Sequence, residues 1–257
     1  MESLVVHSPF QDYFQQSFQI VLADTNQLVE EVFRLRYRVY CEELNYENCE
    51  AFPDGMERDA YDRRAVYCLL KHRASNSFVG CVRVLLSDPK QLEAKFPFEQ
   101  FLDGSSLNFD LHALSRQAIC EVSRLAIISE FRRQKGAVGR TSDVQLTEVE
   151  RFLLPSLPLG LYLAATSVAL ELGIDNAFAM MEGRLARHLQ RFGLYFQQVA
   201  PLTDYHGMRA PFRILPSNVN LREEHCQLFQ RLSSDLRVPL RSLALRYQSA
   251  SLLYTVG

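Results

Sequence analysis

The sequence predicts one α/β domain in which a mixed sheet carries helices on its faces. Short apolar runs alternate with longer segments whose apolar residues repeat at helical spacing. The runs at 65–70 and 78–86 are joined by the polar link 73–77, which predicts a hairpin. A length of 257 residues suits one large domain. We expect it to span residues 1–215, with a C-terminal helical extension, 216–257, packed on it.

Before the hairpin, the chain predicts one strand and one helix. Residues 18–22 form the apolar run Phe-Gln-Ile-Val-Leu and predict the first strand. Thr25 can cap the helix that follows, and this helix ends near Leu44. Its apolar stripe repeats at helical spacing through Leu28, Val32, Leu35 and Val39.

After the hairpin, residues 87–117 predict a long connection and 118–128 predict a strand. Glycines end the two helices expected next, because Gly173 follows 158–172 and Gly193 follows 185–192. The remaining expected elements are strands at 177–181, 195–199 and 212–215, a tail helix at 221–236 and a weak last segment at 240–254.

Composition and charge exclude several classes of protein. The formal charge of −2 gives no general attraction for nucleic acid or an anionic membrane. The six cysteines form no C-x-x-C pair, and the six histidines form no ligand cluster, so we expect no metal site. The first residues lack a signal-peptide pattern, and no apolar run reaches about 20 residues. We therefore expect a cytoplasmic protein with no membrane span and no nucleic-acid partner.

An acidic loop lies between the first helix and the hairpin. The segment 54–62, Asp-Gly-Met-Glu-Arg-Asp-Ala-Tyr-Asp, places four carboxylates within nine residues. Carboxylates in loops are usually solvated, but Met56 and Tyr61 give this loop apolar anchors. Its carboxylates could bind a cationic acceptor or hold an arginine.

Charged residues interrupt two of the predicted strands. Arg83 alternates with Val82 and Val84 and therefore points away from their face. Glu121 and Arg124 are three residues apart, so a regular strand would send them to opposite faces. A β-bulge between them would bring both side chains to one side, and bulges gather next to active sites.

Two basic segments could receive an anion or an acidic partner. Arg132, Arg133 and Lys135 belong to a glycine-containing segment that is either a solvated loop or a phosphate site. Arg184, Arg187 and Arg191 share one helical face, which is otherwise an ordinary polar outer surface. Cys120 beside Glu121 could form an acyl-enzyme, although cysteines in strands are usually inert.

Five motifs follow one another along the chain: 36–40 (Arg-Tyr-Arg-Val-Tyr), 44–46 (Leu-Asn-Tyr), the acidic loop, 80–83 (Gly-Cys-Val-Arg) and 121–124 (Glu-Val-Ser-Arg). In this order they resemble the acyl-homoserine-lactone (autoinducer) synthases of the GNAT acyltransferase superfamily. Within that group the chain is most similar to acyltransferases associated with the PEP-CTERM/exosortase system, which are related to N-acyl amino acid synthases. The resemblance covers about residues 26–200. Tyr46 stands where the lactone synthases usually have tryptophan, and this chain has no tryptophan.

The resemblance implies an acyltransferase that takes a fatty acyl group from acyl carrier protein or CoA and passes it to a small amine. The co-substrate would be an acyl-phosphopantetheine thioester, with no permanently bound cofactor and no metal. The implied GNAT-like fold is a mixed, mostly antiparallel sheet with helices on both faces. A V-shaped opening would split this sheet between the strands at 118–128 and 177–181 and hold the phosphopantetheine arm. The residues that match the family's core positions are Arg36, Tyr40, Tyr46, Glu57, Asp59, Asp62, Arg83, Phe96 or Phe98, Glu121 and Arg124.

The roles we expect follow from this resemblance and from the chemistry of the side chains. Glu57 or Glu121 would take the proton of the amine, and backbone N–H groups around Ser123 would stabilise the oxyanion. The cluster of Asp59, Asp62, Arg36, Arg83 and Arg124 would orient the acceptor. Leu125 and Phe178 would line an acyl tunnel. The two basic segments would dock the acidic carrier protein.

Three interpretations of the function are consistent with the sequence. In the first, the acceptor is an amino acid and the product is an N-acyl amino acid. In the second, the acceptor is S-adenosylmethionine and the product is a lactone. In the third, the same fold serves as a catalytically silent acyl-binding module.

Overall fold

A computed structural model describes residues 9–88, 90–102, 110–132 and 145–252. One eight-stranded sheet runs through the molecule in the order β1-β2-β3-β4-β5-β8-β6, and β7 pairs with β8. All pairings are antiparallel except that of β4 with β5. The strands are β1 (Phe18–Leu22), β2 (Ala65–His72), β3 (Ser77–Leu86), β4 (Ile119–Ile127), β5 (Asn176–Met181), β6 (Gln197–Gln198), β7 (Thr203–Asp204) and β8 (Met208–Ile214).

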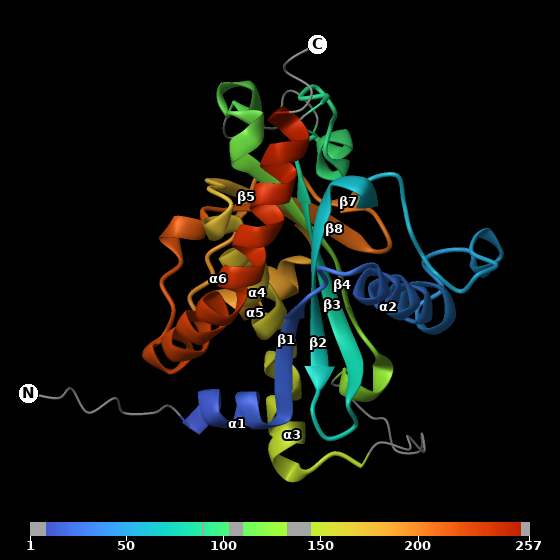
Figure 1. Ribbon diagram of the computed structural model, residues 1–257, viewed down its shortest axis with the longest axis vertical. Helices are drawn as coiled ribbons and strands as arrows, with labels where there is room; N and C mark the ends of the chain where they lie inside the picture. Colours follow the sequence, from blue (N-terminus) through green and yellow to red (C-terminus); the bar gives the residue numbers. More distant parts are fainter. Residues whose placement is uncertain (1–8, 89, 103–109, 133–144, 253–257) are drawn as a thin grey trace, which may run out of the picture.

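Helices cover both faces of the sheet. Figure 1 shows α4 and α6 on one side of the central strands and α2 on the other. The helices are α1 (Pro9–Ser17), α2 (Asn26–Tyr37), α3 (Glu148–Leu153), α4 (Leu157–Glu171), α5 (Gly183–Gln190) and α6 (Glu223–Leu252). The predicted mixed α/β fold and the predicted hairpin, β2–β3, are confirmed.

The sheet divides at the parallel pair. β4 and β5 are in register only from Ile119 to Glu121 and from Asn176 to Phe178. Beyond these three pairs, β4 continues to Ile127 and β5 to Met181 without pairing with each other. The two strands therefore diverge toward their carboxyl ends, which is the V-shaped opening expected from the resemblance.

The core lies mainly between the sheet and α4. Most of α4 is buried, and Leu228, Leu232, Leu236 and Leu240 of α6 are buried at four-residue spacing. Among the described residues, one helical stretch, 148–171, is long and apolar enough to cross a membrane, but 78% of its apolar window is buried inside the protein. A helix in the core of a globular domain has the same composition.

Three elements differ from the sequence-based expectation. α1 was not predicted, and its Phe14 packs so close to α4 that a Cβ at Gly160 would lie 2.6 Å from the ring. The strand expected at 195–199 is reduced to two residues. α6 does not end at 236 but continues through Pro239 to Leu252. Pro239 has no backbone N–H, so the helix lacks one hydrogen bond there, and the packing of α6 outweighs this loss.

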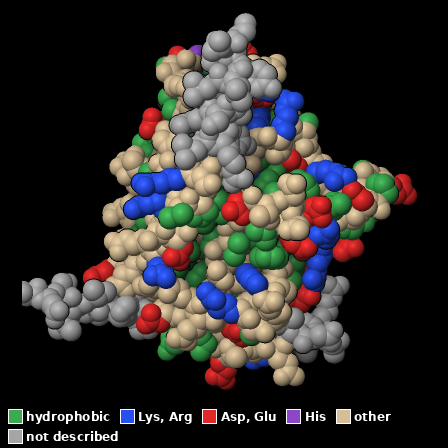
Figure 2. Space-filling model, in the orientation of Figure 1, with side chains coloured by type: hydrophobic (Ala, Val, Ile, Leu, Met, Phe, Trp, Pro, Cys, Tyr) green, Lys and Arg blue, Asp and Glu red, His purple; other side chains and the backbone are tan. Residues whose placement is uncertain are grey.

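The face shown in Figure 2 carries mixed charge. Basic and acidic side chains are interspersed there, with apolar side chains exposed between them. On the described part of this face no single-sign surface stands out. This distribution agrees with the formal charge of −2.

Candidate active site

Hydrogen bonds within the acidic loop turn its carboxylates inward. The backbone N–H of Asp59 donates to Asp62 Oδ2 at 2.7 Å, and the N–H of Tyr61 donates to Asp59 Oδ1 at 2.9 Å. The N–H of Glu57 bonds the carbonyl of Phe33 on α2 at 3.1 Å. These bonds fix three carboxylates against β3 and β4 rather than leaving them in solvent.

Three arginines and three carboxylates alternate in a closed ring. Arg36 pairs with Glu57, and Glu57 pairs with Arg124 at 3.2 Å. Arg124 also pairs with Asp59 at 3.2 Å, and Asp59 pairs with Arg83 at 2.8 Å. Asp62 closes the ring by contacting Arg83 and Arg36, each at 2.8 Å. We call these six residues the charge ring.

Most of the charge ring is buried, and a buried charge is costly unless it is paired. The residues Arg36, Arg83 and Glu57 are 0%, 2% and 1% exposed. Burial alone would raise the pKa of Asp62, but the guanidinium groups of Arg36 and Arg83 outweigh it and hold this pKa at about 2. Asp62 is therefore ionised at neutral pH.

A β-bulge in β4 brings Arg124 and Glu121 to the same side of the sheet. Cys81 faces Ala126 and Arg83 faces Ser123, so β4 contains one more residue than β3 over this interval. Arg124 has a φ of 49°, the left-handed conformation that bulged residues often adopt. Both side chains line the cavity described next.

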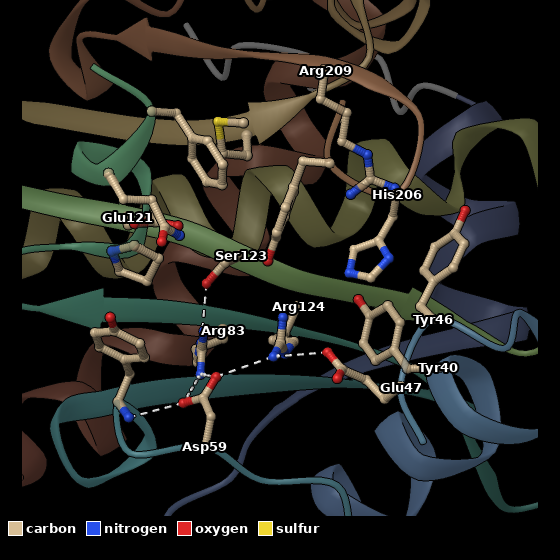
Figure 3. Close-up of a pocket in the computed structure, with 16 residues that line it drawn as sticks. Tyr40, Tyr46, Glu47, Asp59, Arg83, Glu121, Ser123, Arg124, His206 and Arg209 are labelled. Atoms are coloured by element: carbon tan, nitrogen blue, oxygen red, sulfur yellow. Dashed lines mark hydrogen bonds and ion pairs between the residues drawn. The ribbon is translucent and has the colours of Figure 1, made fainter. Parts of the chain in front are cut away.

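The cavity has a volume of about 230 Å³ and lies where β4 and β5 diverge (Figure 3). Its walls come from the acidic loop, from η4 (Pro97–Phe101) and from the β7–β8 hairpin. The lining residues are Tyr40, Tyr46, Glu47, Asp59, Tyr61, Arg83, Pro97, Gln100, Phe101, Glu121, Ser123, Arg124, Met180, Tyr205, His206 and Arg209.

Glu121 is the cavity carboxylate without a cationic partner among the described residues. It is 2% exposed, and the backbone N–H of Phe98 donates to its Oε2 at 2.9 Å. Burial raises the pKa of Glu121 to about 7, against the opposing effects of the Phe98 N–H and of Arg83 and Arg124. A carboxyl group with this pKa can accept and release a proton near neutral pH.

Aromatic rings form the opposite wall. Tyr40 and Tyr46 stack with centroids 6.4 Å apart, and Tyr46 stacks on His206 at 4.8 Å. The hydroxyl of Tyr40 donates to the carbonyl of Leu125 at 3.0 Å, so the ring is anchored to the bulge. The guanidinium of Arg124 lies over the same ring, 5.6 Å from its centroid.

The structure divides the sequence-predicted site residues into two groups. Lining the cavity are Tyr40, Tyr46, Asp59, Arg83, Glu121, Ser123 and Arg124. Behind the wall are Arg36, Glu57, Asp62, Phe96, Phe98, Leu125 and Phe178. Phe98 stacks on Phe178 at 4.3 Å in a second, smaller apolar cluster, whereas Leu125 packs against the main core.

Several lining residues were missed by the sequence reading. Tyr205, His206 and Arg209 come from a hairpin whose first half is polar and lacks a strand pattern. Gln100 and Phe101 belong to the long connection, in which only Phe96-Pro97-Phe98 indicated a contribution to the site.

The basic residues expected to dock a carrier protein have different environments. Arg132 pairs with Glu43 at 2.5 Å, and Arg184 pairs with Glu182 at 2.5 Å. Arg187 and Arg191, on and just after α5, are exposed. Arg133 and Lys135 lie outside the described residues.

Comparisons with known proteins agree with this architecture. Residues 35–141 match the family model described as an acetyltransferase (GNAT) domain. No curated protein sequence matches the chain.

Solved structures give the same fold. TofI, solved in a ternary complex with an inhibitor and MTA, has a TM-score of 0.55 at 19% identity, over 82% of this chain and 96% of TofI. BjaI, a CoA-dependent acyl-homoserine lactone synthase solved with SAM and isopentyl-CoA, has a TM-score of 0.54 at 21% identity, over 84% of this chain and 89% of BjaI.

The fold and the domain match together define the class. The expected GNAT-like acyltransferase fold is confirmed, and so is the expected class of enzyme, an acyltransferase.

Proposed function

We propose that the protein is an N-acyltransferase that moves a fatty acyl group from a phosphopantetheine thioester to the amine of a small acceptor. The proposal rests on one observation, which is the position and environment of the Glu121 side chain. Its carboxyl group has a pKa of about 7 and lines a cavity at the point where β4 and β5 separate. Perturbed carboxyl groups in clefts are typical of catalytic acids and bases.

In the proposed reaction the amine attacks the thioester carbonyl directly. The C–N bond forms first and gives a tetrahedral oxyanion, while Glu121 takes the proton of the amine, through a water molecule where needed. Collapse of this intermediate re-forms the carbonyl and breaks the C–S bond, and the departing thiolate takes up the proton from Glu121. Glu57 was an alternative base, but it lies behind the cavity wall between Arg36 and Arg124, so we assign this role to Glu121.

An acyl-enzyme on Cys120 is not part of this scheme. Cys120 is fully buried on the face of β4 opposite to Glu121 and belongs to the main core. Burial raises the pKa of its thiol. A protonated, inaccessible thiol is a poor nucleophile, so direct transfer is the simpler mechanism.

The acyl chain needs an apolar surface next to Glu121. Met180, Pro97 and Phe101 form the apolar end of the cavity, and this end adjoins the second apolar cluster around Phe98 and Phe178. We place the acyl chain there rather than beside Leu125. Backbone N–H groups near the bulge at Ser123 are the proposed donors to the oxyanion.

The acyl donor is proposed to be acyl carrier protein, with acyl-CoA as the alternative. The exposed arginines of α5, Arg187 and Arg191, are the proposed contacts with the acidic carrier. A cytoplasmic location and the association with an exosortase system stay predictions from the sequence.

An amino acid is our first candidate for the acceptor. S-adenosylmethionine is the second, because the fold is shared with lactone synthases such as BjaI. The protein should be incubated with acyl carrier protein or CoA thioesters of several chain lengths, together with either amino acids or S-adenosylmethionine, and the products analysed by mass spectrometry. An N-acyl amino acid and one equivalent of free thiol support the proposal. A lactone supports the second candidate, and the absence of any amide or lactone overturns both.

A further inference from the structure

Two of the three arginines that line the cavity are paired with protein carboxylates, although the Nε of Arg124 is buried without a hydrogen-bond partner. Arg83 donates from Nη1 to both oxygens of Asp59 and to Asp62, each at 2.8 Å, and from Nε to Ser123 at 3.0 Å. Arg124 contacts Glu57 and Asp59 at 3.2 Å, and Glu47 at 3.5 Å. Binding a substrate carboxylate through either one would disrupt the charge ring.

Arg209 is the lining arginine with which no carboxylate pairs in the described part of the chain. Like the Nε of Arg124, its Nε is buried without a hydrogen-bond partner. Its guanidinium lies over the ring of Tyr46, 5.7 Å from the centroid. Figure 3 shows Arg209 and Glu121 entering the cavity from separate positions on its wall. A buried donor without a partner is costly unless a ligand satisfies it.

The β7–β8 turn holds this part of the cavity in place. Gly207 has a φ of 96°, and its N–H donates to Asp204 Oδ1 at 3.2 Å. His206, with a φ of 50°, is thereby directed onto the ring of Tyr46. Tyr46 thus contacts both His206 and Arg209, and the stack limits the movement of the guanidinium.

We infer that Arg209 binds the carboxylate of the acceptor while Glu121 receives the proton of its amine. The cavity then offers one unpaired acid and one unpaired cation, which is the complement of an α-amino acid. The planar guanidinium suits a carboxylate, since it can donate two parallel hydrogen bonds. This inference rests on the proposed acyl transfer and adds a specificity-determining residue that lies outside the charge ring.

The test compares each standard amino acid with the amine made by its decarboxylation. The wild-type protein should prefer the amino acid, and in Arg209→Met the ratio of the two kcat/KM values should fall roughly ten- to hundred-fold, as expected for the loss of a charge-assisted hydrogen bond. Arg209→Lys, which keeps the charge, should retain part of the preference. Arg213→Met is the matched control, because Arg213 lies on the same strand but pairs with Asn176 at 2.8 Å and does not line this cavity.

Calorimetric titration with the same amino acids provides a readout that does not depend on turnover. Affinity should fall in Arg209→Met and stay at the wild-type value in Arg213→Met. An unchanged preference and an unchanged affinity in Arg209→Met overturn the inference. If amino acids bind through Arg209 but no acyl group is transferred to any amine, the proposed function fails and the carboxylate site stands.

Discussion

The backbone N–H of Phe98 donates a hydrogen bond of 2.9 Å to the buried carboxylate of Glu121. This bond ties η4 to the middle of β4 and leaves the second carboxylate oxygen for the cavity. It favours the ionised form of Glu121, yet burial still keeps the pKa at about 7. Ionised Glu121 therefore lowers the free energy of unfolding at alkaline pH. The same pKa suits this side chain to proton transfer near neutral pH.

The stability of a Glu121→Gln variant should reveal this cost. Because the folded pKa is raised from 4.5 to about 7, the stability that protonation confers is fully present below pH 4.5 and is lost as pH rises through 7. Glutamine can accept the same hydrogen bond but never ionises. At pH 8 the variant should be more stable than the wild type by about 3 kcal/mol. At pH 4 the two should be equal.

Urea denaturation at the two pH values measures this difference. Equal stability at pH 8 would show that Glu121 ionises without cost, contrary to its burial.

The charge ring should contribute strongly to stability because Arg36 and Glu57 lie behind the cavity wall and are almost completely buried. Arg36→Met leaves Glu57 and Asp62 with one cationic partner each. Removing one partner of a buried ion pair costs roughly 3–5 kcal/mol. We expect a loss of this size in chemical denaturation.

Arg34→Met is the matched control for this experiment. Arg34 lies on the same helix and pairs with Glu30 and Glu31, but its side chain is 47% exposed. Exposed pairs contribute little, so no clear loss of stability is expected. Similar losses in the two variants would argue against a special role for the buried ring.

Much of the site could be predicted from the sequence, because its residues interrupt strong local patterns. Charged residues break the apolar pattern of two predicted strands: Arg83 lies between two valines, and Glu121 and Arg124 lie within an apolar run. The bulge was inferred from their odd spacing. These signals are local and survive without knowledge of the tertiary structure.

The other half of the site depends on contacts between distant segments. The sequence around His206 and Arg209 has the polar pattern of a loop. These residues form a wall of the cavity only because β7 pairs with β8. In the same way, the closed charge ring needs the acidic loop to fold back on β3 and β4. No local pattern specifies which arginine remains unpaired.

Truncating Met180 should change the preferred acyl length. Met180 lines the apolar end of the cavity, so Met180→Ala enlarges the proposed acyl site, and the preferred chain should lengthen by about two to three carbons. Met181→Ala is the matched control, since Met181 lies next along β5 but is buried in the main core. Competition among acyl thioesters of different lengths measures the preference. A shift of equal size in both variants would contradict the placement of the acyl chain.

Charge reversal on α5 should separate the two classes of donor. Arg187→Glu should raise the KM for acyl carrier protein several-fold. Its turnover with acyl-pantetheine should stay at the wild-type value. Arg34→Glu reverses an exposed arginine on α2 and should leave both donors unaffected. Added salt should weaken carrier-dependent turnover of the wild type in the same direction as Arg187→Glu. Equal use of carrier protein by Arg187→Glu and wild type would remove α5 from the docking surface.

The pH dependence of kcat/KM for amide formation, compared between wild type and Glu121→Gln, tests the assignment of the catalytic base most directly. For the wild type, kcat/KM should change slope near pH 7, where Glu121 loses its proton. In Glu121→Gln it should be lower by about 10²- to 10⁴-fold and keep only the gradual rise due to deprotonation of the amine. A variant with the rate and the pH profile of the wild type would contradict the central claim that amide formation takes place at Glu121.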